Sequence, residues 1–441
     1  MKSKIEFNIF SLLFSLSIAL IAAMSLHPKS SEAASWSTPV AISSAMASST
    51  PNAVASDPNG NQVWATVATV TGGVAVQASQ RPAGGSWTAL ANISPVVASA
   101  SNVDVAVGAN GGAAAAWATS AGVSVALRLQ GVWQTSTSFA LAGGVSGVHV
   151  KVDASGNGVV VWYRLTSTAS VIEAVTFNNS SFSTVVQLSP SAHPSFLPQV
   201  AINDAGTAVV VWQAAGLLDN SNPYQVESAT RPAGGAWSAV TTVSPSVPQT
   251  WTPQVAVDAA GNATVVWEQG ATVNQYKIYS ATRPANGAWS SPVKIESTAW
   301  YYAGSDTVAT DPAGNVTAAW LGEDSSGATQ VRVAARPAGG SWQTAITVGP
   351  CLTNISLCSA PRIAASADSS IAIVSWAAYG VSNAPNVAVR VGTGTWTRTV
   401  LSIGGGQNVY PMASNNAHGS AVWPESTTGR HRVLLKQSDY H

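Results

Sequence analysis

The sequence predicts an all-β fold built from a repeated sheet unit, and three observations support this prediction. Only 9% of the 441 residues are charged and 17 are Trp, while helix formers such as Glu, Lys and Leu are scarce. A composition dominated by Ala, Val, Ser, Thr and Gly with many Trp is typical of strands and turns. The stretch PQVAVDAAGNATVVW at 253–267 returns as PQVAINDAGTAVVVW at 198–212. Such copies recur about every 50 residues, which is the period of a four-stranded propeller blade.

Eight copies can be aligned on the Trp that ends this stretch. They end at Trp64, Trp117, Trp162, Trp212, Trp267, Trp320, Trp376 and Trp423. We therefore predict an eight-bladed β-propeller with four-stranded blades. The alternative is a seven-bladed ring in which one degenerate unit resembles a blade.

The unit at 253–296 shows the expected order of strands. PQVAVD and ATVVWEQ are the first two strands, joined by the turn AAGN. KIYSATR and WSSPVKIE are the third and fourth, joined by PANGA. The turns carry Gly and Asn, which tolerate a positive φ, and the strands are rich in Val, Ile, Thr and Trp.

The fourth strand predicts how the ring closes. It is expected to begin at Trp36, Trp87, Trp133, Phe182, Trp237, Trp289, Trp342 and Trp396. The first copy, at 36–43, precedes any first strand, and the last unit ends after its third strand. We therefore expect the N-terminal strand to complete the last blade, which removes two open sheet edges.

The N-terminus predicts export. Residues 1–33 have a positive start, an apolar run at 9–26 and small residues before a cleavage point, as in a signal peptide. The alternative is an uncleaved anchor, because the run reaches the lower end of spanning length. Residues 34–441 are then a single β-propeller domain. We expect a monomer in the periplasm, on the cell surface or outside the cell, with no membrane insertion after signal cleavage.

Charge and cysteine content narrow the function classes. The formal net charge is zero, which argues against a nucleic-acid partner. Cys351 and Cys358 are the two cysteines. In an exported protein they predict a short-loop disulfide, with a metal site or a redox pair as alternatives. We expect no cofactor and no metal ion.

A repeated Asp opens the turn between the first two strands, at Asp57, Asp153, Asp258 and Asp311. It predicts a turn in which the carboxylate accepts backbone N–H groups, with calcium binding or catalysis as alternatives. Other units have Asn203, Gly108 and Asn416 at this position, and a metal site would not tolerate that exchange.

The Asp, Gly and Trp of these units, as in Asp258, Gly261 and Trp267, resemble the Asp-box of bacterial sialidase-type exported propellers. They also resemble the Trp-docking repeat of eight-bladed quinoprotein dehydrogenases. The spacings differ from both families, so the resemblance implies a propeller and neither activity.

A second repeated element joins an Arg-Pro pair to a Trp across a Gly-rich turn, as in Arg336 to Trp342. We expect cation–π stacking between the two side chains. The alternative is a sialidase-like Arg cluster that binds a carboxylate. Third strands lie far from the axis and only Arg362 begins an innermost strand, so we do not predict such a cluster.

The variable loops predict where a ligand binds. In a propeller the loops from strand two to three and from strand four to one share one face, and here these loops carry the irregular aromatic and acidic residues. The candidate ligand-binding residues are Tyr224, Trp251, Glu268, Trp300, Tyr301, Tyr302 and Asp306. Aromatic rings beside carboxylates suit sugars or a protein partner. Equally, these rings could only cap the blades.

The sequence thus favours an exported, non-enzymatic binding protein for glycan or protein ligands, with a lectin-like, adhesion or scaffold role. The alternative is a carbohydrate-active enzyme of glycosidase or lyase type, with carboxylates such as Glu268, Asp306 or Glu425 at the channel mouth. No catalytic motif of local spacing is present. A further set of polar residues begins the innermost strands at Asp104, His149, Gln199, Gln254, Thr307 and Arg362. We interpret it as the lining of a water-filled channel in which Asp104 and His149 could pair.

Overall fold

The structure is a computed structural model of the chain. It describes residues 36–38, 40–41, 53–179, 181–215, 223–247, 249–270, 275–296, 302–351, 358–378, 384–401, 409–415, 418–427 and 430–439. Trp36–His441 forms one compact unit. The predicted signal peptide at 1–33 lies outside the described residues. No helix with the length and apolar character of a membrane span occurs among the described residues.

The described strands have four ranks from the centre outward. The innermost are β2 (Ala53–Ser56), β6 (Ala100–Val107), β11 (Val145–Val152), β15 (Ser195–Ile202), β19 (Gln249–Val257), β23 (Tyr302–Thr310), β27 (Arg362–Ala365) and β31 (Tyr410–Ser414). The second rank is β3 (Gln62–Val70), β7 (Ala113–Thr119), β12 (Gly158–Leu165), β16 (Ala208–Ala215), β20 (Ala263–Gly270), β24 (Val316–Glu323), β28 (Ile371–Ala378) and β32 (His418–Thr427).

The third rank is β4 (Gly73–Arg81), β8 (Gly122–Leu129), β13 (Ser170–Phe177), β17 (Tyr224–Arg231), β21 (Lys277–Arg283), β25 (Thr329–Arg336), β29 (Ala384–Val391) and β33 (Arg430–Asp439). The outer rank is β5 (Ala91–Asn92), β9 (Val132–Trp133) with β10 (Thr137–Ala140), β14 (Val186–Gln187), β18 (Thr241–Thr242), β22 (Val293–Lys294), β26 (Ile346–Pro350), β30 (Trp396–Val400) and β1 (Val40–Ala41).

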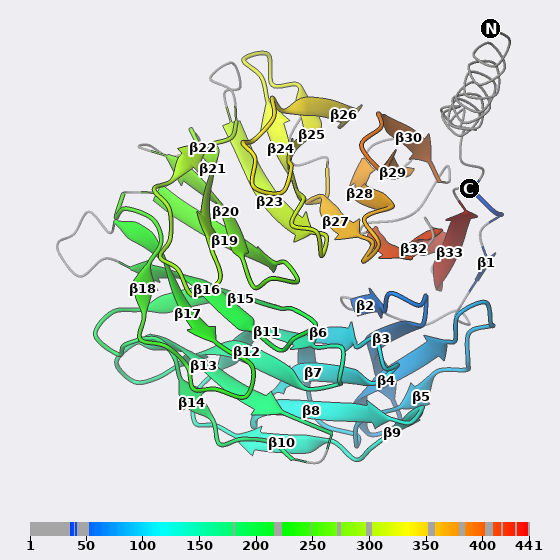
Figure 1. Ribbon diagram of the computed structural model, residues 1–441. Coiled ribbons are helices and arrows are strands. Elements are labelled where there is room, and N and C mark those ends of the chain that lie inside the picture. Colours follow the sequence, from blue (N-terminus) through cyan, green and yellow to red (C-terminus); the bar gives the residue numbers. More distant parts are fainter. Residues whose placement is uncertain are drawn as a thin grey trace, which may run out of the picture. The chain divides into compact units, whose positions relative to one another are not determined.

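These strands form eight separate antiparallel sheets within the described residues, and no described residue is helical. Seven sheets have four strands, and the one that contains β8 has five because both β9 and β10 pair with β8. Figure 1 shows the sheets following one another around a common centre. The protein is therefore an all-β propeller, as the sequence predicts.

Neighbouring sheets meet along their innermost strands. Each innermost strand contacts the next one in the order β2, β6, β11, β15, β19, β23, β27 and β31, and β31 contacts β2. The N-terminal strand β1 pairs with β33, where Val40 is opposite Leu435 and Ala41 is opposite Leu434. The prediction that the first strand completes the last sheet is confirmed.

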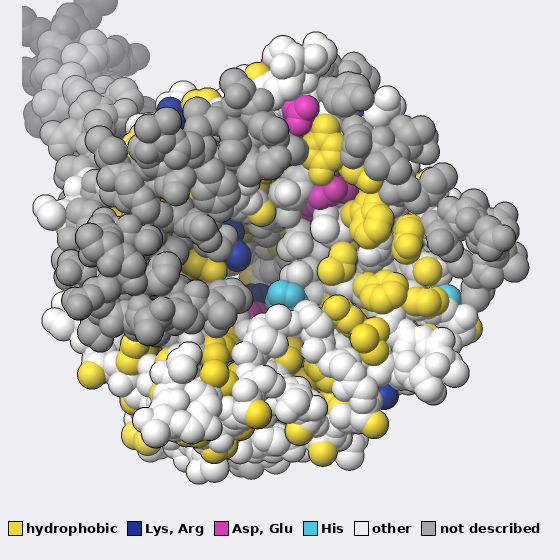
Figure 2. Space-filling view, turned by 180° about the vertical axis from the view of Figure 1, so that it is seen from behind, with side chains coloured by type: hydrophobic (Ala, Val, Ile, Leu, Met, Phe, Trp, Pro, Cys, Tyr) yellow, Lys and Arg dark blue, Asp and Glu magenta, His cyan; other side chains and the backbone are white. Residues whose placement is uncertain are grey.

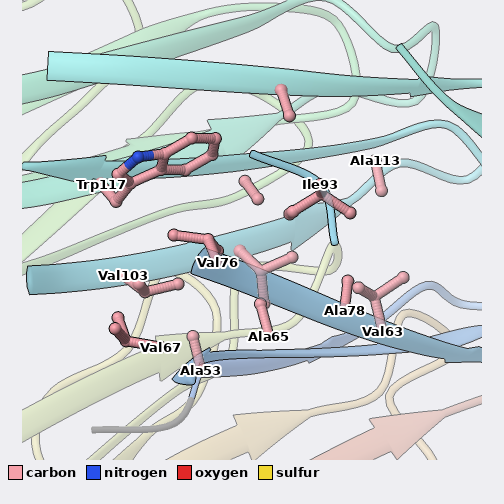
Figure 3. Close-up of a cluster of buried hydrophobic side chains, with 13 residues drawn as sticks. Ala53, Val63, Ala65, Val67, Val76, Ala78, Ile93, Val103, Ala113 and Trp117 are labelled. Atoms are coloured by element: carbon pink, nitrogen blue, oxygen red, sulfur yellow. The ribbon is translucent and has the colours of Figure 1, made fainter. Parts of the chain in front are cut away.

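The core lies between the sheets. Among the described residues, the eight Trp residues that end the repeated segment are the largest fully buried side chains. Each occupies the second strand of its sheet, where a buried ring can pack against the next sheet. Figure 3 shows one such layer, in which Trp117 of β7 packs with Val76 of β4 and Val103 of β6. The repeated Trp is therefore architectural.

Most of the fourth strands are shorter than the sequence predicts. The segment expected to begin at Trp289 forms ladder pairs only at Val293–Lys294. Before that point the bonds of Ser290 take the place of regular strand pairing. Its backbone N–H donates to the Thr282 carbonyl, and its Oγ accepts from the Thr282 N–H. Such side-chain bonds compete with sheet pairing, and Pro292 removes another donor.

The repeated Asp stabilises its turn, as predicted. Asp258 accepts the Asn262 backbone N–H at 2.8 Å and the Asn262 side-chain amide at 2.8 Å. Gly261 adopts φ +87°, which completes the turn. The same pair of bonds occurs at Asp57, Asp153 and Asp311.

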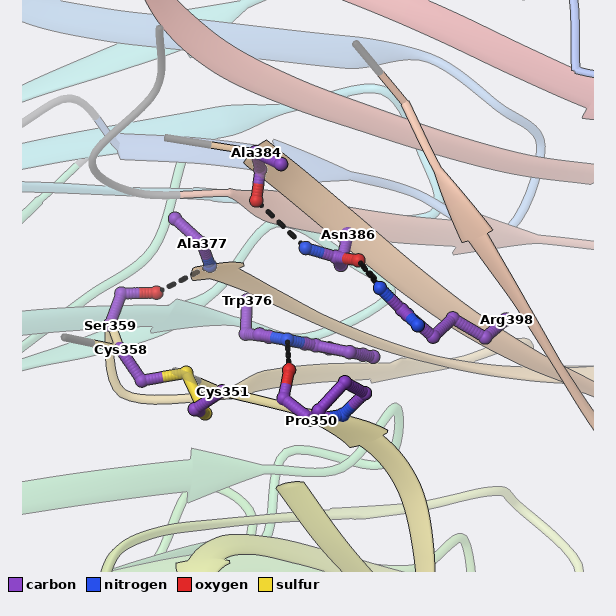
Figure 4. The surroundings of a disulfide bond; sticks show 9 residues. All are labelled: Pro350, Cys351, Cys358, Ser359, Trp376, Ala377, Ala384, Asn386 and Arg398. Atoms are coloured by element: carbon purple, nitrogen blue, oxygen red, sulfur yellow. Dashed lines mark hydrogen bonds between the residues drawn. A yellow bond between two sulfur atoms is a disulfide. The ribbon is translucent and has the colours of Figure 1, made fainter. Parts of the chain in front are cut away.

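Two further predictions about structure are confirmed. Cys351 and Cys358 form a disulfide with an S–S distance of 2.06 Å, which lies beside the indole of Trp376 (Figure 4). The guanidinium of Arg336 lies 5.9 Å from the ring centre of Trp342.

Candidate functional site

The site begins with an irregularity that the innermost strands share. Five successive innermost strands, β6, β11, β15, β19 and β23, each contain a β-bulge. At each bulge one residue has a positive φ, namely Asn102, Gly147, Leu197, Thr252 or Ser305. Bulges of this kind redirect neighbouring side chains.

The residue after the positive φ distinguishes β23 from the other four strands. It is Val103 in β6, Val148 in β11, Pro198 in β15 and Pro253 in β19, all apolar and buried. In β23 it is Asp306, which is only 6% exposed. A carboxylate that replaces a core residue costs desolvation energy, so its presence indicates a role beyond packing.

Asp306 lies close to a second buried carboxyl group. Glu268 of β20 is also 6% exposed. The Thr252 hydroxyl lies 2.9 Å from Glu268 Oε1 and 3.2 Å from Asp306 Oδ1. The Ser305 backbone N–H donates to Glu268 Oε1 at 2.6 Å. The two residues with positive φ therefore supply both hydrogen bonds to Glu268, one from the Thr252 hydroxyl and one from the Ser305 backbone N–H.

The shared hydroxyl favours one proton between the two acids. A Thr hydroxyl has one hydrogen to donate, so it can donate to only one of the two carboxyl groups. It can bond to both when the other carboxyl group is protonated and donates its own hydrogen to the Thr252 hydroxyl oxygen. Burial raises the pKa of Asp306 well above its ordinary value, and the charge of Glu268 raises it further. Burial also raises the pKa of Glu268, against the hydrogen bonds from Ser305 and Thr252. Asp306 Oδ2 is buried without a hydrogen-bond partner in the described part of the chain.

Two pairs of aromatic side chains flank the acids. Trp251 lies opposite Glu268 in the ladder of β19 and β20, and its ring centre is 5.2 Å from that of Tyr224. On the other side the rings of Tyr302 and Tyr276 meet edge to face at 5.4 Å. We call these four rings and the two acids the aromatic–acid cluster.

Tyr302 connects the aromatic rings to the acids. Burial raises the pKa of Tyr302, and the charges of Glu268 and Asp306 raise it further, so the phenol stays protonated and can donate a hydrogen bond. The phenol lies over Gly304, where any side chain would collide with it. One face of the molecule shows hydrophobic side chains gathered beside acidic ones on one side of a central hollow (Figure 2).

Five of the seven predicted binding residues thus come together in the structure. Tyr224, Trp251 and Tyr302 are partly buried, whereas Glu268 and Asp306 are buried. Trp300 and Tyr301 lie outside the described residues, and so does the side chain of Glu425.

Sequence reasoning did not assign roles to Thr252 or Ser305. Their signal was available in the alignment of repeats. Thr252 and Ser305 directly precede Pro253 and Asp306, which occupy the same position in their repeats. That position is apolar in the other repeats, and Asp306 is the exception. Among the described residues no group of three or more His, Cys, Asp or Glu side chains is arranged to hold a metal ion.

Comparisons with known proteins support the fold. No protein-family model and no curated protein matches the chain. The structure is similar to the BP39L lectin from Burkholderia pseudomallei, with a TM-score of 0.52 and 16% identity over 80% of this chain and 98% of the lectin. It is also similar to the polysaccharide lyase Uly1, with a TM-score of 0.50 and 10% identity over 88% of this chain and 89% of the lyase.

The structure also matches an α-L-arabinanase from Penicillium chrysogenum complexed with arabinobiose. That match has a TM-score of 0.43 and 10% identity over 92% of this chain and 98% of the arabinanase chain. At the identities of the lectin and the lyase, the likeness shows the fold, which is a β-propeller.

Proposed function

We propose that this chain is an exported glycan-binding protein, an eight-bladed β-propeller that holds sugars at the aromatic–acid cluster. Eight sheets within the described residues, the cycle of contacts between their innermost strands and the pairing of β1 with β33 support the blade count. The disulfide between Cys351 and Cys358 supports export to an oxidising compartment.

The observation that carries the proposal is the position of the two acids between two pairs of rings. Sugars present apolar faces that stack on aromatic rings and hydroxyl groups that need hydrogen-bond partners. Trp251 and Tyr302 provide partly exposed ring surface from adjacent sheets. The Tyr302 phenol is partly buried and protonated, and it can donate a hydrogen bond to a sugar hydroxyl.

A second candidate function is glycoside hydrolysis, and the Glu268–Asp306 pair favours it. Two carboxyl groups whose pKa values are raised can act as general acid and as nucleophile or base. Because one hydroxyl contacts both groups, their separation is below that of inverting glycosidases and nearer that of retaining ones. We favour binding because both carboxyl groups are buried, and each is committed to the same Thr252 hydroxyl. The lyase and the lectin show that the fold alone does not decide between the two.

A glycan array with residues 34–441 tests the proposal, followed by calorimetric titration of the glycans that bind. Trp251→Ala should weaken binding about tenfold or more, since a lost sugar–ring contact of about 1.4 kcal/mol corresponds to tenfold. Phe196→Ala is the matched control, because Phe196 has the register of Trp251 in the neighbouring sheet and faces no acid pair. No glycan binding by the wild-type chain, or equal loss in both variants, would overturn the proposal.

Incubation of the bound glycans with the wild-type chain separates binding from hydrolysis. We expect the glycans to remain intact. New reducing ends that disappear in Asp306→Asn would establish the second candidate instead.

A further inference from the structure

A second set of polar side chains surrounds the centre of the propeller. In seven sheets the innermost strand places a polar residue directly opposite the residue before the buried Trp of the second strand. We call this set the channel ring, and its members are Asp104, His149, Gln199, Gln254, Thr307, Arg362 and Tyr410. Six of them were recognised in the sequence, and the register of β31 adds Tyr410.

One side of the channel ring is internally satisfied. His149 Nδ1 lies 3.5 Å from Asp104 Oδ2, so the predicted pairing of these residues is confirmed. Gln199 Nε2 lies 3.1 Å from His149 Nε2, which places a proton on Nδ1 for the carboxylate. Asp104 Oδ2 also accepts the Val150 backbone N–H at 3.0 Å. Asp104 Oδ1 accepts the Val105 backbone N–H at 2.9 Å. Asp104 therefore has three partners and little need of a ligand.

The other side of the ring holds an uncompensated cation. The Arg362 guanidinium lies 4.3 Å from the ring centre of Tyr410, and Arg362 is exposed. No carboxylate lies within ion-pair distance of Arg362 in the described part of the chain. Stacking uses the flat face of a guanidinium and leaves its N–H edge available for a planar, bidentate partner.

The balance of charge at the ring is positive. Lys151 lies two residues after His149 in β11, on the same side of the strand. Burial acts to raise the pKa of Asp104, but the charge of Lys151 and the contacts with His149 and Val150 lower it to about 2. Asp104 is therefore ionised and offsets one of the two fixed cations, Lys151 and Arg362.

The ring opens to solvent at the centre of the molecule. Figure 2 shows basic, histidine and acidic side chains meeting at the rim of the central hollow. At the other end of the innermost strands a cavity of about 180 Å³ is lined by residues of six of these strands and the turns that follow them, among them Asp57, Asp204 and Asp311.

We propose that the channel ring binds the carboxylate of an acidic saccharide, with Arg362 as the anchor. The carboxylate takes the N–H edge of Arg362, and the Gln254 amide and the Gln199 amide oxygen meet the neighbouring sugar hydroxyls. The saccharide part of this proposal rests on the proposed function. Thr307 of the ring directly follows Asp306 of the aromatic–acid cluster, so one ligand can reach both sites. Anion binding by Arg362 stands on the ring alone.

Titration with an oligosaccharide of uronic acids and with its carboxyl-reduced neutral counterpart tests this site. We expect residues 34–441 to bind the acidic form at least about tenfold more tightly at low salt, and Arg362→Gln to abolish that preference. Lys294→Gln is the matched control, because it removes one exposed positive charge from the outer strand β22. It should leave the preference unchanged.

The other outcomes separate the two proposals. Equal affinity for both forms, an unchanged preference in Arg362→Gln, or tighter binding of an acidic peptide than of the uronate would overturn the channel-ring proposal. Loss of neutral-glycan binding in Trp251→Ala would still support the aromatic–acid cluster in those cases. An Arg362-dependent preference in Trp251→Ala would support the channel ring even if the cluster bound nothing.

Discussion

At the scale of single residues, Asp306 is the clearest departure from the repeat. The four equivalent positions are apolar because the bulge points them into the core between sheets. A buried carboxylate there is expensive, and the structure reduces that cost by protonation and by the Thr252 hydroxyl. The pair with Glu268 should therefore respond to pH as a unit.

Asp306→Asn should remove a pH dependence of folding stability. Asp306 and Glu268 have raised pKa values in the folded state. The stability that their neutral forms contribute is full below the ordinary values of 3.8 and 4.5 and is lost as the pH rises through the raised values. Each unit by which a folded pKa is raised costs about 1.4 kcal/mol once the group ionises.

Urea unfolding of the wild type and the variant from pH 4 to pH 8 measures this effect. The variant should gain stability relative to the wild type as the pH rises. Asp204→Asn, on an exposed turn, is the control and should follow the wild-type curve. Parallel curves for Asp306→Asn and the wild type would show that the pair ionises without cost.

The sequence identified most members of the candidate site but not their arrangement. Glu268 and Asp306 are carboxylates near the ends of strands, which a linear reading can detect. Their connection through Thr252 depends on a left-handed residue inside a strand, and residue type does not predict it. Leu197, at φ +51°, shows that the bulge is imposed by the sheet and not by local preference.

At the scale of elements, the repeated turn between the first two strands stabilises each sheet and its contact with the next one. Asn203 performs the role of Asp in its own unit, because its Oδ1 accepts the Thr207 backbone N–H at 2.9 Å. Its amide also donates to the Asp258 carbonyl in the next sheet at 3.1 Å. In the unit of Gly108, the Asn110 Oδ1 accepts the Gly112 backbone N–H instead. The turn therefore uses a side-chain acceptor that need not be charged.

Replacement of Asp258 tests this requirement. Asp258→Ala should cost about 2 kcal/mol, because the Asn262 backbone N–H and side-chain amide lose a charged acceptor. Asp258→Asn should cost about half as much, since it keeps the backbone bond and loses the side-chain one. Chemical denaturation measures both values. An equal loss in the two variants, or a calcium-dependent rise in the melting temperature of the wild type, would favour a metal site at the turn.

The extent of the strands was predicted less well than their order. The alternation of apolar residues and the Gly-containing turns predict the first three strands of each sheet. The outer strands have exposed residues, so their pairing is set by individual hydrogen bonds, such as those of Ser290, rather than by a buried pattern. Hydrophobic periodicity carries no information about such pairing.

At the scale of the whole molecule, we expect closure of the ring to depend on the N-terminal strand. β1 pairs with β33 through two residues, and Trp36 packs against the core that contains Trp423. A chain that begins at residue 46 lacks both contacts, whereas a chain that begins at Trp36 keeps them. We expect the shorter chain to lose about 2 kcal/mol or more, because hydrogen bonds and the packing of a partly buried indole are both removed.

The shorter chain should melt several degrees below the chain that begins at Trp36. It should also self-associate, because β33 then presents an unpaired edge to other molecules. Differential scanning calorimetry and light scattering measure the two effects, with the chain that begins at Trp36 as the control. Equal melting temperatures and a monomeric shorter chain would mean that contacts between innermost strands hold the ring without its closing strand. Melting that is lowered together with concentration-dependent association would establish β1 as the closure of the propeller.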